Sequence, residues 1–303
     1  MFVCALVLGC GVESRAQSRW ESAQERIGAI VSETGMAVPS APAAAVVPVV
    51  AHVVAVPPSR QGPYVVIFKG RTICAGCETP FETLFRARGY GIRKVGPGQS
   101  TPELLAGAAA YVVPGGEDVS RLRDAWTPSD LQAIRGYIAN GGRYLGVCLG
   151  GYWAGRAGAW PGTLSGFEAL DIIPARVLEL SPDGTRGKVV PIHWKGRPRQ
   201  AYFQDAPSFE ITDPSRVLKI YATYDDNGYV AAFLSRYGSG TVAVSGVHLE
   251  ATQDWYDDYR LPAPPNLNRD LMSEVLDDLL NNGPVPEIGE ISGLPASRQT
   301  RAL

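Results

Sequence analysis

The feature that most constrains this chain is a repeated order of short apolar runs and amphipathic helices. Three runs, YVVIF (64–68), AAYVVPGG (109–116) and YLGVCLGG (144–151), are rich in β-forming residues and show no polar alternation, as expected of strands buried on both faces. PFETLFRARGYG (80–91) and SDLQAIRGYIANGG (129–142) lie between them and have helical spacing. Strands that alternate with helices predict an α/β fold with a parallel sheet and right-handed crossovers.

The second half of the chain is richer in strand patterns. Four segments read as strands: KVVPIHW (188–194), VLKIYATY (217–224), YVAAFLSRYG (229–238) and GTVAVSG (240–246). DDNG (225–228) is typical of a tight turn, and NRDLMSEVLDDLL (268–280) is predicted to form the last helix.

Composition narrows the class of protein. The chain has 303 residues, 45% hydrophobic and 19% charged, which is enough apolar material for a large core. Its net charge of −2 does not favour nucleic acid as a partner, and no transmembrane-length apolar stretch follows the N-terminus.

The first 63 residues differ from the rest. Residues 1–16 are expected to be a signal segment, and VLGC (7–10) resembles a lipobox in which Cys10 would be lipidated. Residues 17–63 are predicted to form a polar helix and a Pro/Ala/Val-rich tether, followed by a folded domain over 64–283 and a tail over 284–303. We expect an exported protein, anchored to a membrane if Cys10 is lipidated. The alternatives are an ordinary signal peptide and a cytoplasmic protein.

The CAGC motif formed by Cys74 and Cys77 leaves several alternatives open. It could be a redox pair, half a zinc site, a local disulfide or two loop thiols beside a pocket. No second CxxC and no histidine cluster completes a zinc site in the sequence, so no metal is expected.

Cys148 stands alone between a predicted strand and a predicted helix. Gly146, Gly150 and Gly151 surround it, which is the composition of a sharp nucleophile elbow. The start of the following helix supplies N–H groups that lower the pKa of a thiol and stabilise an oxyanion.

Two places are candidates for the oxyanion donors. The Leu149 N–H is one, and the Gly115–Gly116 turn at the end of the neighbouring strand is the other. Both lie at the carboxyl ends of strands, where parallel sheets bind ligands.

A cysteine nucleophile needs a base, and the chain has three histidines. His52 lies in the predicted tether and His193 in a strand, which leaves His248. Glu250 follows two residues later and can lie on the same side of an extended segment, where it would orient the imidazole. Alternatively, His248 and Glu250 merely end a strand.

The motifs GVCLGG and GVHLE resemble the class I glutamine amidotransferase-like superfamily. The closer resemblance is to the biotin-protein ligase N-terminal domain family, through YVVPGGED, IANGGRYLGVCLGGYWAG, GFEAL, AYFQDAPSF and AAFLSRYGSGTVAVSGVHLE. This resemblance implies a flavodoxin-like three-layer sandwich with a mostly parallel central sheet. It also implies a Cys148–His248–Glu250 triad and an oxyanion loop at Gly115 and Gly116.

The chain departs from the glutaminase pattern. Tyr152 stands where glutaminase members carry a glutamine that helps to bind substrate glutamine, and Leu249 replaces a proline between the histidine and the glutamate. No synthase, synthetase or biotin ligase catalytic domain is recognisable, so we expect neither ammonia transfer nor biotin attachment.

The sequence therefore favours a cysteine hydrolase or amidase of unknown substrate that needs no cofactor. Four residues are candidates to line its pocket: Glu117, Tyr152, Trp194 and Tyr202. The alternative is a module that binds a small molecule on the same scaffold without catalysis. A third, weaker hypothesis is a thiol-redox protein that acts through CAGC.

Overall fold

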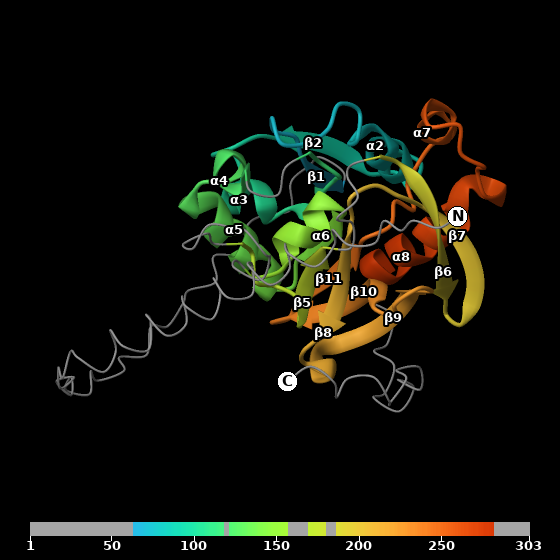
Figure 1. Ribbon diagram of the computed structural model, residues 1–303. Helices are drawn as coiled ribbons and strands as arrows, with labels where there is room; N and C mark the ends of the chain where they lie inside the picture. Colours follow the sequence, from blue (N-terminus) through green and yellow to red (C-terminus); the bar gives the residue numbers. More distant parts are fainter. Residues whose placement is uncertain (1–62, 118–120, 157–168, 180–185, 282–303) are drawn as a thin grey trace, which may run out of the picture. The chain divides into compact units, whose positions relative to one another are not determined.

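The computed structural model describes residues 63–117, 121–156, 169–179 and 186–281 (Figure 1). They lie within one compact unit, Val56–Leu303. The predicted signal segment with Cys10, the tether up to residue 62 and the tail over 284–303 lie outside the described residues. Within the described ranges, no helix is both long and apolar enough to cross a membrane.

A mixed sheet forms the centre of the domain. Its parallel half contains, in spatial order, β2 (Gly91–Val95), β1 (Tyr64–Phe68), β3 (Ala108–Val113), β4 (Arg143–Val147) and β11 (Gly240–Ser245). Its antiparallel half continues with β10 (Val230–Tyr237), β9 (Val217–Tyr224), β6 (Lys188–Trp194) and β7 (Arg197–Phe203). Off this path, β5 (Ala175–Glu179) pairs with β8 (Pro207–Ile211), which also pairs with β10. The predicted parallel core is confirmed.

Helices cover both faces of the sheet (Figure 1). The described α-helices are α2 (Thr79–Arg86), α3 (Pro102–Leu105), α4 (Leu122–Ala125), α5 (Pro128–Ala139), α6 (Leu149–Ala154), α7 (Gln253–Asp258) and α8 (Arg269–Asn281). Short 3-10 turns are η2 (Pro214–Arg216) and η3 (Pro265–Asn268). One core cluster packs the sheet against α3–α6, and the other packs it against α2 and α8. Alternate residues of β1 enter different clusters, Val66 the first and Val65 the second, which is the three-layer arrangement.

Local sequence explains where the helix before the site begins and ends. Thr127 and Asp130 form a capping box at the start of α5, in which each side chain accepts a hydrogen bond from the other residue's backbone N–H. The chain leaves α5 through Gly141, whose φ of 101° suits glycine. β4 follows at once and carries the chain to Cys148.

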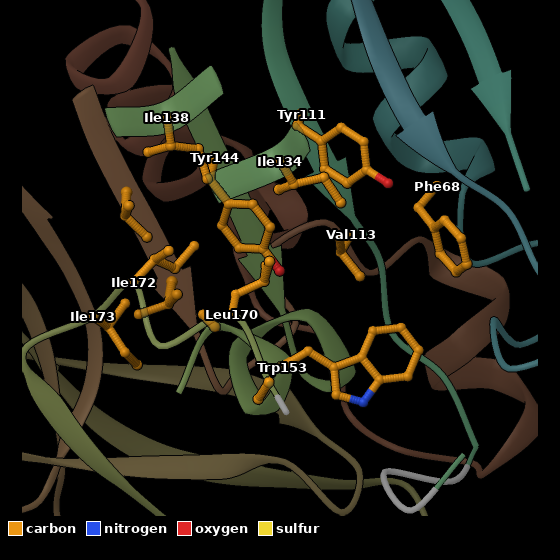
Figure 2. Close-up of a cluster of buried hydrophobic side chains, with 14 of the residues drawn as sticks. Phe68, Tyr111, Val113, Ile134, Ile138, Tyr144, Trp153, Leu170, Ile172 and Ile173 are labelled. Atoms are coloured by element: carbon orange, nitrogen blue, oxygen red, sulfur yellow. The ribbon is translucent and has the colours of Figure 1, made fainter. Parts of the chain in front are cut away.

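Aromatic packing beneath α6 supports the end of β4 (Figure 2). The buried ring of Trp153 lies 4.9 Å from the Trp126 ring and 6.1 Å from the Phe68 ring, centroid to centroid. Tyr144 stacks on Tyr111, and its hydroxyl donates a 2.8 Å hydrogen bond to the Gly150 carbonyl. The helix that begins after Cys148 is therefore tied to the core from its first turn.

Candidate active site

The strand-to-helix turn at Cys148 has an unusual backbone. Cys148 has φ 51° and ψ −108°, a conformation that residues with a side chain rarely adopt. Small neighbours make the turn possible: a Cβ on Gly150 would lie 2.1 Å from the Val113 carbonyl oxygen, and one on Gly146 would lie 2.4 Å from the Gly150 oxygen. The turn leaves the Cys148 thiol at the carboxyl end of β4, with the residue 4% exposed.

His248 and Glu250 come from the segment that follows β11, the strand beside β4. The His248 Nδ1 hydrogen-bonds to Glu250 Oε1 at 2.8 Å, and both side chains are buried. The His248 backbone N–H donates to the Tyr202 carbonyl at 2.9 Å, which anchors the segment on β7. Because Nδ1 is engaged by Glu250, Nε2 is the ring nitrogen available to Cys148.

The electrostatics of the pair favour a charged imidazole. Burial lowers the pKa of His248, but the charges of Glu250 and Cys148 and hydrogen bonds to both side chains outweigh burial and raise that pKa to about 10. The raised pKa favours the doubly protonated ring of His248, which faces the Glu250 carboxyl group.

The Pro-Gly-Gly loop after β3 lies directly against these side chains. A Cβ on Gly115 would lie 2.9 Å from His248 Cε1 and 3.7 Å from Cys148 Cβ, and a Cβ on Gly116 would lie 2.1 Å from Leu149 Cδ2. The Leu149 N–H is the first of α6 and has no intrahelical partner. The structure thus brings together all three predicted oxyanion residues with Cys148 and His248.

The four predicted pocket residues differ in their placement. The buried Tyr202 ring lies 5.8 Å from the His248 ring, edge to face. Glu117 is exposed at the end of the Pro-Gly-Gly loop. Tyr152 is buried in the core cluster on the α3–α6 side of the sheet, whereas Cys148 belongs to the other cluster.

Trp194 is not brought to the site. In the β6–β7 hairpin Tyr202 pairs with Val189, five residues before Trp194, so the two aromatic residues lie about 16 Å apart along the strands. The Trp194 ring stacks on Tyr221, and its indole N–H donates to Glu274 Oε2 at 3.0 Å. It lines a separate cavity of about 390 Å³ between the hairpin and α8. Its prediction as a pocket residue is corrected.

Two further residues, Gln204 and Trp255, contact Cys148 or His248 and were not singled out from the sequence; Asp205 follows Gln204 in the chain. Gln204 follows β7, and its carbonyl oxygen accepts a 3.7 Å hydrogen bond from Cys148 Sγ. Asp205, half-buried, has φ 47°, and burial raises the pKa of its carboxyl. The Trp255 ring, from α7, lies 5.2 Å from the His248 ring. The polar residues of AYFQDAPSF could have indicated Gln204 and Asp205 from the sequence, whereas no sequence pattern indicated Trp255.

Of the alternatives open for CAGC, the structure has a disulfide between Cys74 and Cys77, with Cα atoms 5.4 Å apart. Cys148 is a free cysteine. Across the residues that the structure describes, no group of three His, Cys, Asp or Glu side chains is arranged to hold a metal ion.

The parallel core, the crossover helices and the turn at Cys148 form an α/β fold that solved structures share. The structure of PurLQS from Thermotoga maritima shares this fold: it is 12% identical, with a TM-score of 0.50, over 73% of this chain and 98% of that one. A crystal structure of a glutamine amidotransferase is 22% identical over 64% of this chain and 95% of that one, with a TM-score of 0.45.

Residues 83–194 match the family model described as "Biotin-protein ligase, N terminal". The resemblance predicted from the sequence is therefore confirmed for this segment. A biotin–protein ligase of Schizosaccharomyces pombe is 25% identical over 173 residues, which are 48% of this chain and 26% of that protein. The chain thus matches about a quarter of the length of this curated relative.

Proposed function

We propose that the protein is a cysteine hydrolase that cleaves an amide or related acyl bond, with Cys148 as nucleophile, His248 as acid and base, and Glu250 as the group that orients His248. The observation that carries the proposal is the contact of Cys148, in a left-handed backbone conformation, with a buried histidine whose pKa is raised to about 10. Ordinary structural histidines do not need a buried carboxylate on one nitrogen and a thiol on the other.

In the first half of the reaction, the Cys148 thiolate attacks the acyl carbon of the substrate. A C–S bond forms, and the carbonyl electron pair moves onto oxygen. In this proposal the Leu149 and Gly116 N–H groups donate to this oxygen, because hydrogen bonds from preorganised donors stabilise such a charge. The support is that Leu149 begins α6 beside Cys148 and that Gly116 packs against the Leu149 side chain. When the intermediate collapses, the C–N bond breaks, and His248 gives its Nε2 proton to the leaving amine.

In the second half, neutral His248 accepts a proton from a water molecule that attacks the thioester. The C–S bond breaks, the acid leaves, and the proton on His248 restores the starting ion pair. Glu250 remains a carboxylate throughout and stabilises the imidazolium each time it forms.

The surroundings of Cys148 bear on the substrate. Tyr152 is packed into the core and supplies no side chain equivalent to a glutamine-binding amide, so we do not propose glutamine as the substrate. Biotin transfer is not part of the proposal, because the matched segment is only 26% of the ligase that carries that name.

Acylation of Cys148 by p-nitrophenyl acetate tests the proposal. We expect a burst of p-nitrophenol, an acetyl group on the peptide that contains Cys148 in mass spectra, and slow turnover. Cys148→Ala should abolish the burst, and His248→Ala should slow both acylation and release by at least about a hundredfold. If Cys148→Ala keeps the full burst, the acetyl group resides elsewhere and the proposal is wrong.

A second candidate function is a binding module, favoured by one observation: Cys148 and His248 are each only 4% exposed. In that case Cys148 would not be acylated, and a ligand screen by thermal shift would give the same result with wild-type protein and Cys148→Ser.

A further inference from the structure

The Cys74–Cys77 disulfide lies in a segment that the proposed reaction does not use. This segment, residues 69–78, connects β1 to α2 at the carboxyl edge of the parallel sheet. Glu78 anchors its end: the Glu78 carboxylate is buried and pairs with Lys69 at the segment's start. Cys74 is half-buried, and Ala75 and Gly76 are exposed, so solvent reaches this side of the disulfide.

The same segment holds the Pro-Gly-Gly loop. Ile73 and Gly116 form an antiparallel bridge, in which the Glu117 N–H donates to the Thr72 carbonyl at 3.1 Å and the Cys74 N–H donates to the Gly115 carbonyl at 3.4 Å. The Cys74 sulfur also lies 3.4 Å from the Gly115 oxygen. The disulfide therefore touches the backbone of the residue whose other side faces His248 and Cys148.

The geometry points to a positioning role for the disulfide. Cys74 and Cys77 lock the 69–78 segment so that it holds the Pro-Gly-Gly loop, which ends at Glu117, against the Cys148 site. This inference rests on the proposed function, since the loop is the proposed source of an oxyanion donor. Reduction by a dithiol such as dithiothreitol would break the S–S bond, convert both cysteines to thiols and leave the reductant as a disulfide. The loop would then loosen, and Cys148 would react more slowly, which makes the site dependent on redox state.

The sequence around the disulfide agrees with this role. The loop glycines cannot hold their own position by side-chain packing, and Gly115 and Gly116 must lack side chains to fit between His248, Leu149 and Thr72. The neighbouring segment has to supply the rigidity that the loop lacks. A bridge between residues three apart, facing the loop, restricts the backbone at the point where Cys74 binds Gly115.

Hydrogen exchange on the full chain tests the inference. The amides of residue 74 and Glu117 are measured in oxidised wild type, in wild type fully reduced by dithiothreitol, and in Cys74→Ser/Cys77→Ser. We expect the exchange rates of these two amides to rise by up to about 20-fold in both altered samples. This factor corresponds to the loop-closure entropy of the ring of about four residues that the disulfide closes. The Gly151 and Tyr152 amides, which donate to the Cys148 carbonyl, are the internal control and should change by less than about twofold.

The alkylation rate of Cys148, followed by mass spectrometry of its own peptide, is read in the same samples. A slower rate together with faster exchange at Glu117 supports the inference. Unchanged exchange at Glu117, or faster exchange with an unchanged Cys148 rate, overturns it. An inert Cys148 in the oxidised wild type would instead contradict the proposed function. Should the double variant fail to fold, the reduced wild type carries the test alone.

Discussion

Gly115→Ala is the substitution whose consequence follows most directly from the geometry. The added methyl group would lie 2.9 Å from His248 Cε1, whereas carbon atoms in good contact are about 3.5 Å apart. Either the loop or the imidazole must therefore move by at least about 0.6 Å. Because a 1 Å misplacement in an active site costs on the order of a hundredfold in rate, we expect Cys148 acylation to fall by about tenfold or more.

The same clash has a cost in stability. Overpacking a filled site typically costs about 1–3 kcal/mol, and each kcal/mol is about 2–4 °C in Tm for a domain of this size. Gly136→Ala is the matched control, because Gly136 lies inside α5 and a Cβ there meets nothing within 4 Å. This control should gain about 0.5–1 kcal/mol and keep the wild-type rate of acylation.

The assay combines acylation by p-nitrophenyl acetate with thermal unfolding of wild type, Gly115→Ala and Gly136→Ala. A Gly115→Ala protein with the wild-type Tm and the wild-type acylation rate would show that the loop is not packed against His248.

Three further predictions follow from the same contacts. Glu250→Gln removes the carboxylate that favours the charged imidazole, so the titration midpoint of His248 in NMR spectra should fall below the wild-type value of about 10; an unchanged midpoint would exclude Glu250 as its counter-ion. The folded-state pKa of His248 lies above its ordinary value, so its contribution to stability is complete below about pH 6.5 and is lost as pH rises through about 10. In urea unfolding, the difference in free energy of unfolding between wild type and His248→Gln should therefore shrink by up to about 1.4 kcal/mol per pH unit in that window. A constant difference would contradict the raised pKa. Trp194→Phe loses the bond to Glu274 but should keep the acylation rate of Cys148, whereas a large loss of rate would return Trp194 to the site.

The strands that the sequence indicates most clearly are the ones buried on both faces. All five residues of β1 are buried, as are the last four of β4, so each gives an unbroken apolar run. The strands β2, β5, β7 and β8 were not predicted. Of these, β2 and β7 lie at the two ends of the main strand order and carry exposed charged residues, so neither shows an apolar run or a clean alternation.

Some residues of the candidate site could be predicted from the sequence, and others could not. The sequence indicates Cys148 through the glycines beside it, and it indicates His248 through Glu250 two residues later. Both patterns involve residues within a few positions of one another. Trp255 and Gln204 reach the site only through the packing of α7 and β7 beside His248, which no local pattern encodes. Trp194 was misplaced because a strand pattern does not tell which end of a hairpin faces the site.

The pH dependence of Cys148 alkylation shows whether His248 activates the Cys148 thiol. The rate with iodoacetamide is measured on wild type, His248→Ala and the control His193→Ala, whose half-exposed side chain pairs with Asp225 at 3.2 Å, with the Cys74–Cys77 disulfide left intact. An ordinary thiol reacts little at pH 6, since only its thiolate is nucleophilic. If His248 activates the Cys148 thiol, wild type and His193→Ala react at pH 6 at least about tenfold faster than His248→Ala. Equal, slow rates in all three proteins would contradict this activation.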